Sequence, residues 1–227
     1  MEAVYYGHST VGLNLNNIEV LFDPFITHNK LAAHVDLGAL KPDYIFLSHC
    51  HGDHVADLVE VQRNGNSQVV SIVESAAWVK KQGIATDKVT GMNFGGTIST
   101  DFGSAKMVYA LHTNSTPEGG YAGVAAGYVL KSGDKTIYFA GDTALTLEMQ
   151  LLADQNLDWA FLPIGGFFTM DVEDAIKAAG LINCKNIIGI HYNTFPPIEI
   201  NTEEAIEKFR KAGFNLHLLK VGEKISL

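Results

Sequence analysis

The chain has 227 residues, of which 47% are hydrophobic, and 25 acidic against 16 basic residues give it a formal net charge of -9. This length and apolar content suffice for a sizeable buried core, and we expect a single domain over residues 1–227. The acidic balance, without any run of Lys or Arg, argues against nucleic acid or an anionic membrane surface as a partner, because phosphates bind basic patches.

The beginning of the chain, MEAVYYGHST, has an acid at its second position and only a short apolar stretch, unlike a secretory signal. No apolar run approaches the roughly 18 residues that span a bilayer. The two cysteines, Cys50 and Cys184, are too few for a disulfide framework. We therefore expect a cytoplasmic protein without membrane insertion.

Five short runs rich in β-branched and aromatic residues each lead into a His or an Asp. We predict a strand for each run. The strand ends of a layered α/β fold are where sites are built, because the sheet is rigid while the loops that leave it vary. The runs are 17–22, 43–47, 106–111, 136–140 and 186–190, and the residues that they deliver are Asp23, His49, His112, Asp142 and His191.

Helical spacing lies between some of these strands. Apolar residues at i, i+3 and i+4 predict a helix that begins at about Asp53, where an acid suits the positive end of the helix dipole. Residues 171–179, with Asp171 as N-cap, and residues 203–211 predict two more helices. We therefore expect layers of sheet and helix, which place the chain in the α/β fold class.

The stretch HCHGDH, residues 49–54, places several side chains of metal-binding type within six positions. His49 and His51 are two apart in an extended segment, so both rings project to one side and Cys50 projects to the other. Four ligands would saturate one tetrahedral zinc, and the strand-end residues exceed that number, so we expect two neighbouring cations. Imidazole with carboxylate suits zinc first, with manganese or iron as alternatives. The candidate ligands are His49, His51, Asp53, His54, His112, Asp142 and His191.

This H-x-H-x-D-H pattern, with its three downstream partners, resembles the metallo-β-lactamase superfamily over nearly the whole chain. Further motifs resemble one bacterial and archaeal branch of metal-dependent hydrolases, which is similar to the ascorbate-6-phosphate lactonases and the N-acyl-phosphatidylethanolamine phospholipase D enzymes. The resemblance implies a four-layer αββα sandwich with the site at one edge of its two sheets. The motifs are GHS at 7–9, DPF at 23–25, GDT at 141–143, PIGGFFTM at 163–170 and HYNTFP at 191–196.

The resemblance also implies a role for each candidate. Asp142 would bridge two cations, and Asp23 would orient a ligand histidine from behind. We expect Asp53, His8 and Asp23 to act in catalysis, with His8 as a candidate proton donor to the leaving group. Taken alone, His8 also fits a hydrogen-bonded structural residue, and Asp23 fits a turn before a proline. The implied sets are His49, His51 and His112 for the first cation, and Asp53, His54 and His191 for the second.

The predicted activity is hydrolysis of a small ester, lactone or phosphodiester by a hydroxide that two metal ions activate. Loops such as 113–121 contain no base, which favours a small substrate over RNA. Other classes remain as alternatives: a metal-dependent redox or sulfur-handling protein, and a non-catalytic metal-binding protein. The pair Phe167 and Phe168 fits either core packing or a substrate wall. Related enzymes often assemble, so a homo-oligomer stays open.

Overall fold

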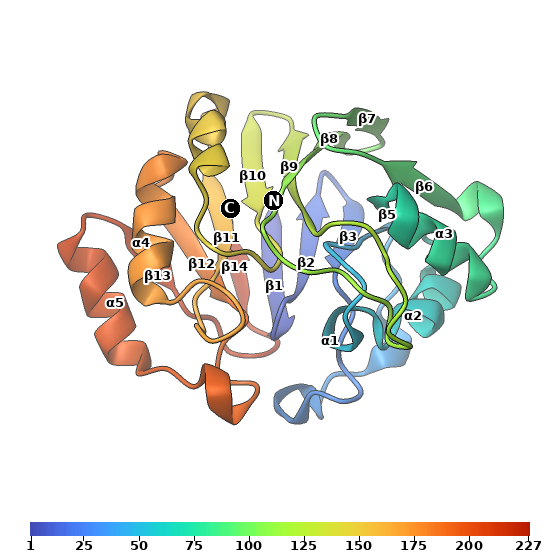
Figure 1. Ribbon diagram of the computed structural model, residues 1–227, viewed down its shortest axis with the longest axis horizontal. Coiled ribbons are helices and arrows are strands. Elements are labelled where there is room, and N and C mark those ends of the chain that lie inside the picture. Colours follow the sequence, from blue (N-terminus) through green and yellow to red (C-terminus); the bar gives the residue numbers. More distant parts are fainter.

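The computed structural model describes all 227 residues and consists of two seven-stranded sheets packed face to face (Figure 1). The first sheet has the order β14-β1-β2-β3-β4-β5-β6, antiparallel from β14 to β3 and parallel from β3 to β6. Its strands are β1 (Glu2–Gly7), β2 (Thr10–Leu15), β3 (Ile18–Phe22), β4 (Tyr44–Phe46), β5 (Gln68–Ile72), β6 (Val89–Met92) and β14 (Lys224–Ser226).

The second sheet repeats this plan with the order β13-β12-β11-β10-β9-β8-β7. It is antiparallel from β7 to β10 and parallel from β10 to β13. Its strands are β7 (Thr97–Thr100), β8 (Gly103–Tyr109), β9 (Ala126–Ser132), β10 (Lys135–Phe139), β11 (Trp159–Pro163), β12 (Asn186–Ile190) and β13 (Asn215–His217).

Helices cover the outer face of each sheet. Helices α2 and α3 lie over the first sheet, and α4 and α5 lie over the second (Figure 1). The predicted four-layer αββα sandwich is confirmed. The helices are α1 (Gly52–Val55), α2 (Leu58–Gly65), α3 (Val73–Lys81), α4 (Val172–Leu181) and α5 (Thr202–Lys211), and the 3-10 turns are η1 (Lys30–Ala32), η2 (Leu37–Ala39), η3 (Thr86–Lys88), η4 (Leu147–Gln155) and η5 (Pro196–Ile198).

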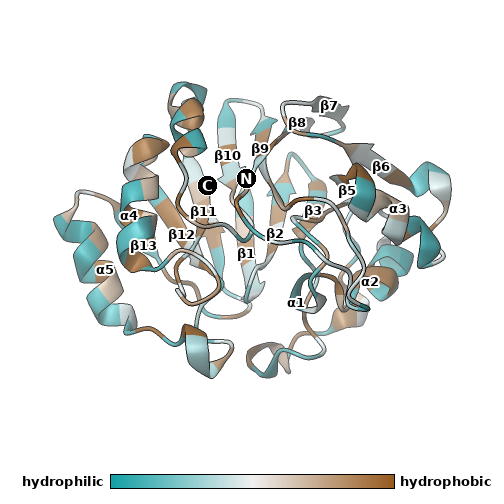
Figure 2. Ribbon diagram, viewed as in Figure 1, coloured by the Kyte–Doolittle hydropathy of each residue, from teal (hydrophilic) through white to brown (hydrophobic).

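The main core lies between the two sheets, where β3 and β10 meet. The fully buried rings of Phe22 and Phe139 stack with their centroids 4.0 Å apart. Burial of each such side chain stabilises the fold by roughly 1.5–3 kcal/mol. Because Phe22 directly precedes Asp23, and Phe139 lies three residues before Asp142, this packing holds two strand ends in fixed positions. Figure 2 shows brown, hydrophobic strands between outer helices that carry much of the teal, hydrophilic colour.

The five predicted strands occur as β3, β4, β8, β10 and β12, and residues 186–190 match β12 throughout. The run 106–111 departs most, because β8 already ends at Tyr109. Beyond that point the Leu111 N–H donates to Thr143 Oγ1 at 3.0 Å, so this segment follows the loop after β10 and leaves the sheet.

The helix predicted from Asp53 is interrupted after one turn, and the chain continues as the separate helix α2. The cause is Asp57, whose backbone leaves the helical region between the two helices. Its carboxylate accepts hydrogen bonds from the backbone N–H groups of Ile26 and Thr27 at 2.5 and 3.0 Å. The other two helices were predicted correctly, and Asp171 caps α4 by accepting from the Asp174 N–H.

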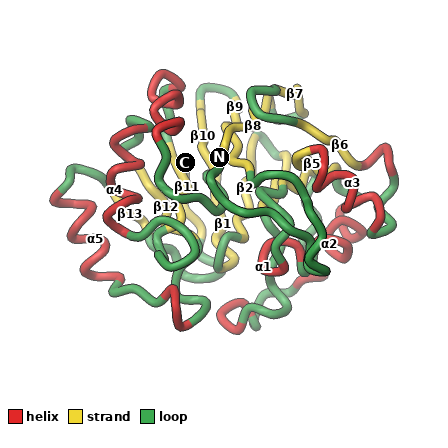
Figure 3. The backbone as a smooth tube through the Cα atoms, in the orientation of Figure 1, coloured by secondary structure: helices red, strands yellow, loops and turns green.

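The loops that leave the carboxyl ends of the strands cross the front of the molecule (green in Figure 3). The two chain ends lie on β1 and β14, which pair with each other. None of the helices combines the length and the apolar character needed to cross a membrane.

Candidate metal centre

Six strands, three from each sheet, deliver the predicted site residues to one edge of the sandwich. The His191 N–H donates to the His8 carbonyl at 2.8 Å, which joins the two sheets at this edge. The site is therefore shared by both halves of the chain. Strands β1, β3, β4, β8, β10 and β12 lead to His8, Asp23, His49, His112, Asp142 and His191 respectively.

A first donor group consists of His49, His51 and His112, whose ligand atoms lie within 4.8 Å of one another. His49 Nε2 and His51 Nδ1 are 2.9 Å apart. Two ring nitrogens this close repel each other through their lone pairs unless a proton or a cation lies between them. The group therefore has the donor chemistry of a site for a divalent cation.

A second donor group consists of Asp53, His54 and His191, and the structure adds His8 to it. The sequence reasoning assigned the first three to one cation, and they do lie together. The ligand atoms of all four are within 4.8 Å of one another.

Asp142 lies between the two donor groups, and its side chain is buried. Its Oδ2 atom is 3.0 Å from His191 Nε2 and 3.4 Å from His54 Nε2, both in the second group. The same oxygen is 3.7 Å from His112 Nε2 and 4.0 Å from His49 Nε2, both in the first group. One carboxylate oxygen thus faces four imidazoles.

Several buried atoms of this cluster have no hydrogen-bond partner. They are His54 Nε2, Asp142 Oδ1 and His191 Nδ1. Buried polar atoms are nearly always paired, so a group of orphans needs an explanation. For His54 Nε2 and Asp142 Oδ1, a cation held at this point would supply it. The residues present therefore fit divalent metal ions.

For His49 and Asp142, the electrostatics favour the protonation states that a metal requires. Burial lowers the pKa of His49 well below its ordinary value, and the neighbouring His54 adds to the shift. Burial opposes ionisation of Asp142, but His191 and His54 outweigh it and hold the pKa of this carboxyl well below its usual range. His54 differs: burial opposes its charge, yet Asp142 and Asp23 raise its pKa well above the ordinary value. His54 is thus the place where positive charge is most favoured.

Behind the ligands, Asp23 and Ser48 orient two histidines. The Asp23 carboxylate accepts from His54 Nδ1 at 2.9 Å, from the Ser48 N–H at 2.8 Å and from the Ser48 hydroxyl at 2.6 Å. Ser48 Oγ lies 2.9 Å from His49 Nδ1 and can accept its proton. One buried carboxylate thereby fixes the tautomers of His54 and His49, so that each presents Nε2 to the centre.

The sequence reasoning assigned Asp23 to this position but did not identify Ser48. The only sign of Ser48 in the sequence was that a hydroxyl side chain directly precedes the first histidine of the motif. Ser48 also explains Gly141, which has φ +62 and where a Cβ atom would lie 2.5 Å from the Ser48 Cβ. Only glycine allows the loop that carries Asp142 to approach this closely.

His8 is buried and its two ring nitrogens contact protein atoms. Nε2 lies 3.1 Å from Asp53 Oδ2, and Nδ1 lies 3.1 Å from Thr194 Oγ1. Burial, with His191 nearby, lowers the pKa of His8 to about 4. The ring is therefore neutral at physiological pH, and it holds the Asp53 carboxylate. His8, Asp23 and His191 all have positive φ, which non-glycine residues adopt at a cost.

Cys50 points away from the donor groups, as strand alternation predicts. It is buried in an apolar cluster, and burial raises the pKa of its thiol to about 12. Its backbone N–H donates to Asn114 Oδ1 at 2.9 Å, which ties the motif to the loop after His112. The sequence reasoning missed Asn114. Asn193 shapes a turn, since its side chain accepts from the Ile200 N–H at 2.8 Å.

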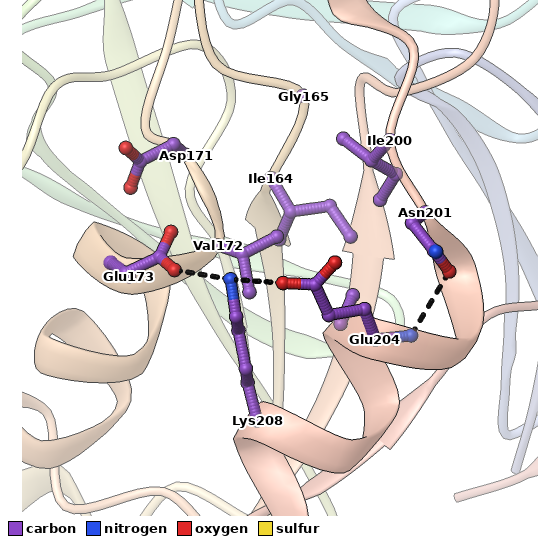
Figure 4. A pocket seen from close by; sticks show the side chains of 10 residues that line it. Ile164, Gly165, Asp171, Val172, Glu173, Ile200, Asn201, Glu204 and Lys208 are labelled. Carbon is purple, nitrogen blue, oxygen red and sulfur yellow. Dashed lines mark hydrogen bonds and ion pairs between the residues drawn. The ribbon is translucent and has the colours of Figure 1, made fainter.

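A separate hollow of about 210 Å³ opens between α4 and α5 (Figure 4). Lys208 spans it and pairs with Glu173 at 2.5 Å and Glu204 at 2.8 Å. None of the candidate metal ligands lines this hollow. Its charges are satisfied within the protein, so it is distinct from the metal centre.

Comparisons with known proteins agree with this fold. A family model described as beta-lactamase superfamily domain matches residues 19–192. A metal-dependent hydrolase of Flavobacterium johnsoniae is 46% identical over 228 residues, which cover 100% of both chains. The solved structure of a metallo hydrolase from the archaeon Ignicoccus hospitalis is 30% identical, covers 99% of this chain and 97% of its own, and has a TM-score of 0.89. A diiron β-hydroxylase of Streptomyces venezuelae shares the fold, with a TM-score of 0.74 at 13% identity over 100% of this chain and 53% of its own.

The chain belongs to the metallo-β-lactamase superfamily. Within it, the protein is a metal-dependent hydrolase, as the full-length relatives are.

Proposed function

We propose that the protein hydrolyses a small ester, lactone or phosphodiester with two divalent metal ions, as a single domain over residues 1–227 and in the cytoplasm. Zinc is the first candidate for both ions, and manganese or iron are the alternatives. The main observation that supports two ions is that Asp142 Oδ2 lies within 4.0 Å of histidines from both donor groups. The proposed ligands are His49, His51 and His112 for one ion, Asp53, His54 and His191 for the other, and Asp142 for both.

When bound, divalent cations lower the pKa of a water molecule towards neutrality and stabilise negative charge that develops on the substrate. The protein does the rest with its own residues. Asp142 keeps its carboxylate between the two donor groups, and Asp23 with Ser48 holds two imidazoles in the required tautomer. His8 holds Asp53 in place. These buried contacts set the geometry before a substrate arrives, which is how an enzyme avoids reorganisation in the transition state.

The charge around the centre supports a small substrate. Three of the segments at the strand ends, residues 109–121, 163–171 and 191–197, contain no Lys or Arg. A nucleic acid would have no basic contacts there. A small molecule is therefore the proposed partner, without nucleic acid. Assembly into a homo-oligomer stays open.

The test is a side-by-side rate measurement on metal-stripped protein reloaded with zinc, manganese or iron. Bis-p-nitrophenyl phosphate and a simple lactone are the two substrates. We expect hydrolysis of at least one that depends on the added metal and saturates at two ions per chain. Oxygen consumption with iron in place of hydrolysis would favour the redox alternative. Tight metal binding without turnover of any ester would favour a non-catalytic metal-binding protein.

His8 remains a candidate proton donor to the leaving group, a role that requires its neutral ring to take up a proton from the solvent before it passes one on. We expect His8→Ala to slow substrates with poor leaving groups by about 10²-fold or more, the usual range for general acid catalysis, and nitrophenyl substrates by much less. Rates are measured with a p-nitrophenyl ester and an alkyl ester of the same acid. An equal loss on both would contradict the role and leave His8 as the residue that positions Asp53.

A further inference from the structure

The loop between β11 and α4 is fixed against two of the loops that carry candidate ligands. At its beginning, Gly165 lies so close to the His191 carbonyl that a Cβ atom would be 2.2 Å from that oxygen. At its end, the Met170 N–H donates to the Thr143 carbonyl at 3.0 Å, directly after Asp142. The tip of the loop therefore stands between the loops of His191 and Asp142.

This tip presents two aromatic side chains to solvent. Phe167 is 78% exposed and Phe168 is 52% exposed, and their rings meet edge to face with centroids 4.7 Å apart. Core packing, one of the two interpretations from the sequence, is wrong for both residues. Exposed apolar side chains that gather at one place mark a surface for another molecule.

The backbone at the tip is strained, and this strained conformation keeps the aromatic side chains exposed. Phe167 has φ 56, a conformation that bulky residues rarely adopt and that glycine adopts freely. Its exposed ring gains little from burial to offset that cost. Strain of this kind is typical of functional sites. The position thus keeps an aromatic side chain where the fold alone would favour glycine.

Other apolar side chains lie on or beside the loops that carry candidate ligands. Leu111, which precedes His112, is 46% exposed, and its backbone contacts Thr143 and Ala144 through two hydrogen bonds of 3.0 Å. Phe195 packs edge-on against His8 with ring centroids 5.4 Å apart. Hydrophobic groups therefore follow the ligand loops around the centre.

We infer that Phe167 and Phe168 form an apolar wall beside the metal centre and select substrates that carry an apolar acyl or aryl group next to the bond that is cleaved. The inference rests on the proposed hydrolytic function. The substrate's apolar group lies against the two rings, while its reacting group lies over the donor groups.

The experiment compares p-nitrophenyl hexanoate with p-nitrophenyl acetate on zinc-loaded protein. We expect kcat/KM to favour the hexanoate by at least about tenfold, since even one of its four additional methylenes contributes discrimination of this size in an apolar site. The double variant Phe167→Gly with Phe168→Ala should bring this ratio close to one, with the larger loss on the hexanoate. Leu151→Ala is the matched control, because Leu151 is 78% exposed on η4, the amber helix at the top of Figure 1, and should keep the ratio.

Thermal unfolding separates this effect from a loss of folding. Glycine relieves the positive φ at position 167, so Phe167→Gly alone should keep or raise the unfolding midpoint while it lowers the ratio. A ratio that the double variant leaves unchanged would overturn the inference. So would an oligomer that dissociates in the double variant, since the pair would then be a contact between copies of the chain.

Binding measurements keep the two proposals distinguishable. If no ester, lactone or phosphodiester is hydrolysed, the proposed function fails. Calorimetric titration of zinc-loaded protein with sodium hexanoate and sodium acetate then still tests the wall. Tighter hexanoate binding that the double variant loses would support it, and equal binding of the two acids would overturn it.

Discussion

Replacing Asp142 by Asn should lower hydrolytic activity by about a thousand-fold, at the upper end of what the loss of one preorganised electrostatic group costs. The change keeps the size of the side chain but removes the negative charge from an oxygen that faces four imidazoles. Without that charge the two donor groups lose their shared ligand. We expect the bound metal to fall below two ions per chain, as measured by elemental analysis after gel filtration.

The control is Asp101→Asn, the same chemical change at an exposed residue whose carboxylate accepts from the Tyr44 hydroxyl. It should keep both the metal content and the rate. Two tightly held ions and near-normal turnover in Asp142→Asn would refute the assignment of Asp142 as the shared ligand.

Replacing Asp23 by Ala should destabilise the metal-free protein by about 3–5 kcal/mol, the usual cost of removing one partner from a buried charged pair. The variant leaves His54 Nδ1 and the Ser48 N–H without their acceptor inside the protein. Their burial prevents water from replacing it easily, because both residues are at most 1% exposed. Urea unfolding of metal-stripped protein measures the loss.

Ser48→Ala is the matched variant, because it keeps the contact between Asp23 and His54 and removes the hydroxyl that contacts both Asp23 and His49. It should cost about 2 kcal/mol in stability, because two hydrogen bonds are lost and the typical net value of each is about 1 kcal/mol. Its zinc affinity should fall about tenfold, as expected for an outer partner of a metal-binding histidine. Equal zinc affinity in Ser48→Ala and the unaltered protein would show that His49 needs no such partner.

The strand ends could be predicted from the sequence because each of them combines two local signals. A short β-branched run predicts the strand, and the His or Asp after it stands at the sheet edge by geometry alone. This reasoning brought together the candidate ligands at the ends of β4, β8, β10 and β12 without any knowledge of strand order. It also placed Cys50 on the opposite side from its neighbouring histidines.

The supporting contacts could not be predicted, since they join residues that are distant in the chain. Ser48 contacts Asp23 across 25 positions, and Asn114 contacts Cys50 across 64. A serine or an asparagine carries no periodic signal that would reveal such a partner. The exposure of Phe167 was equally hidden, because an aromatic residue beside two glycines fits a buried turn as well as a displayed one.

The pairing of β1 with β14 has a practical consequence for how the chain tolerates a change in the order of its strands. The Met1 carbonyl accepts from the Leu227 N–H at 3.2 Å, so these two residues already touch. A short peptide could close them into a ring, and the chain could be reopened in an exposed turn such as the one around Gly133 and Asp134, between β9 and β10. The two sheets would then be encoded in a different order, while the strand ends that surround the metal centre keep their places.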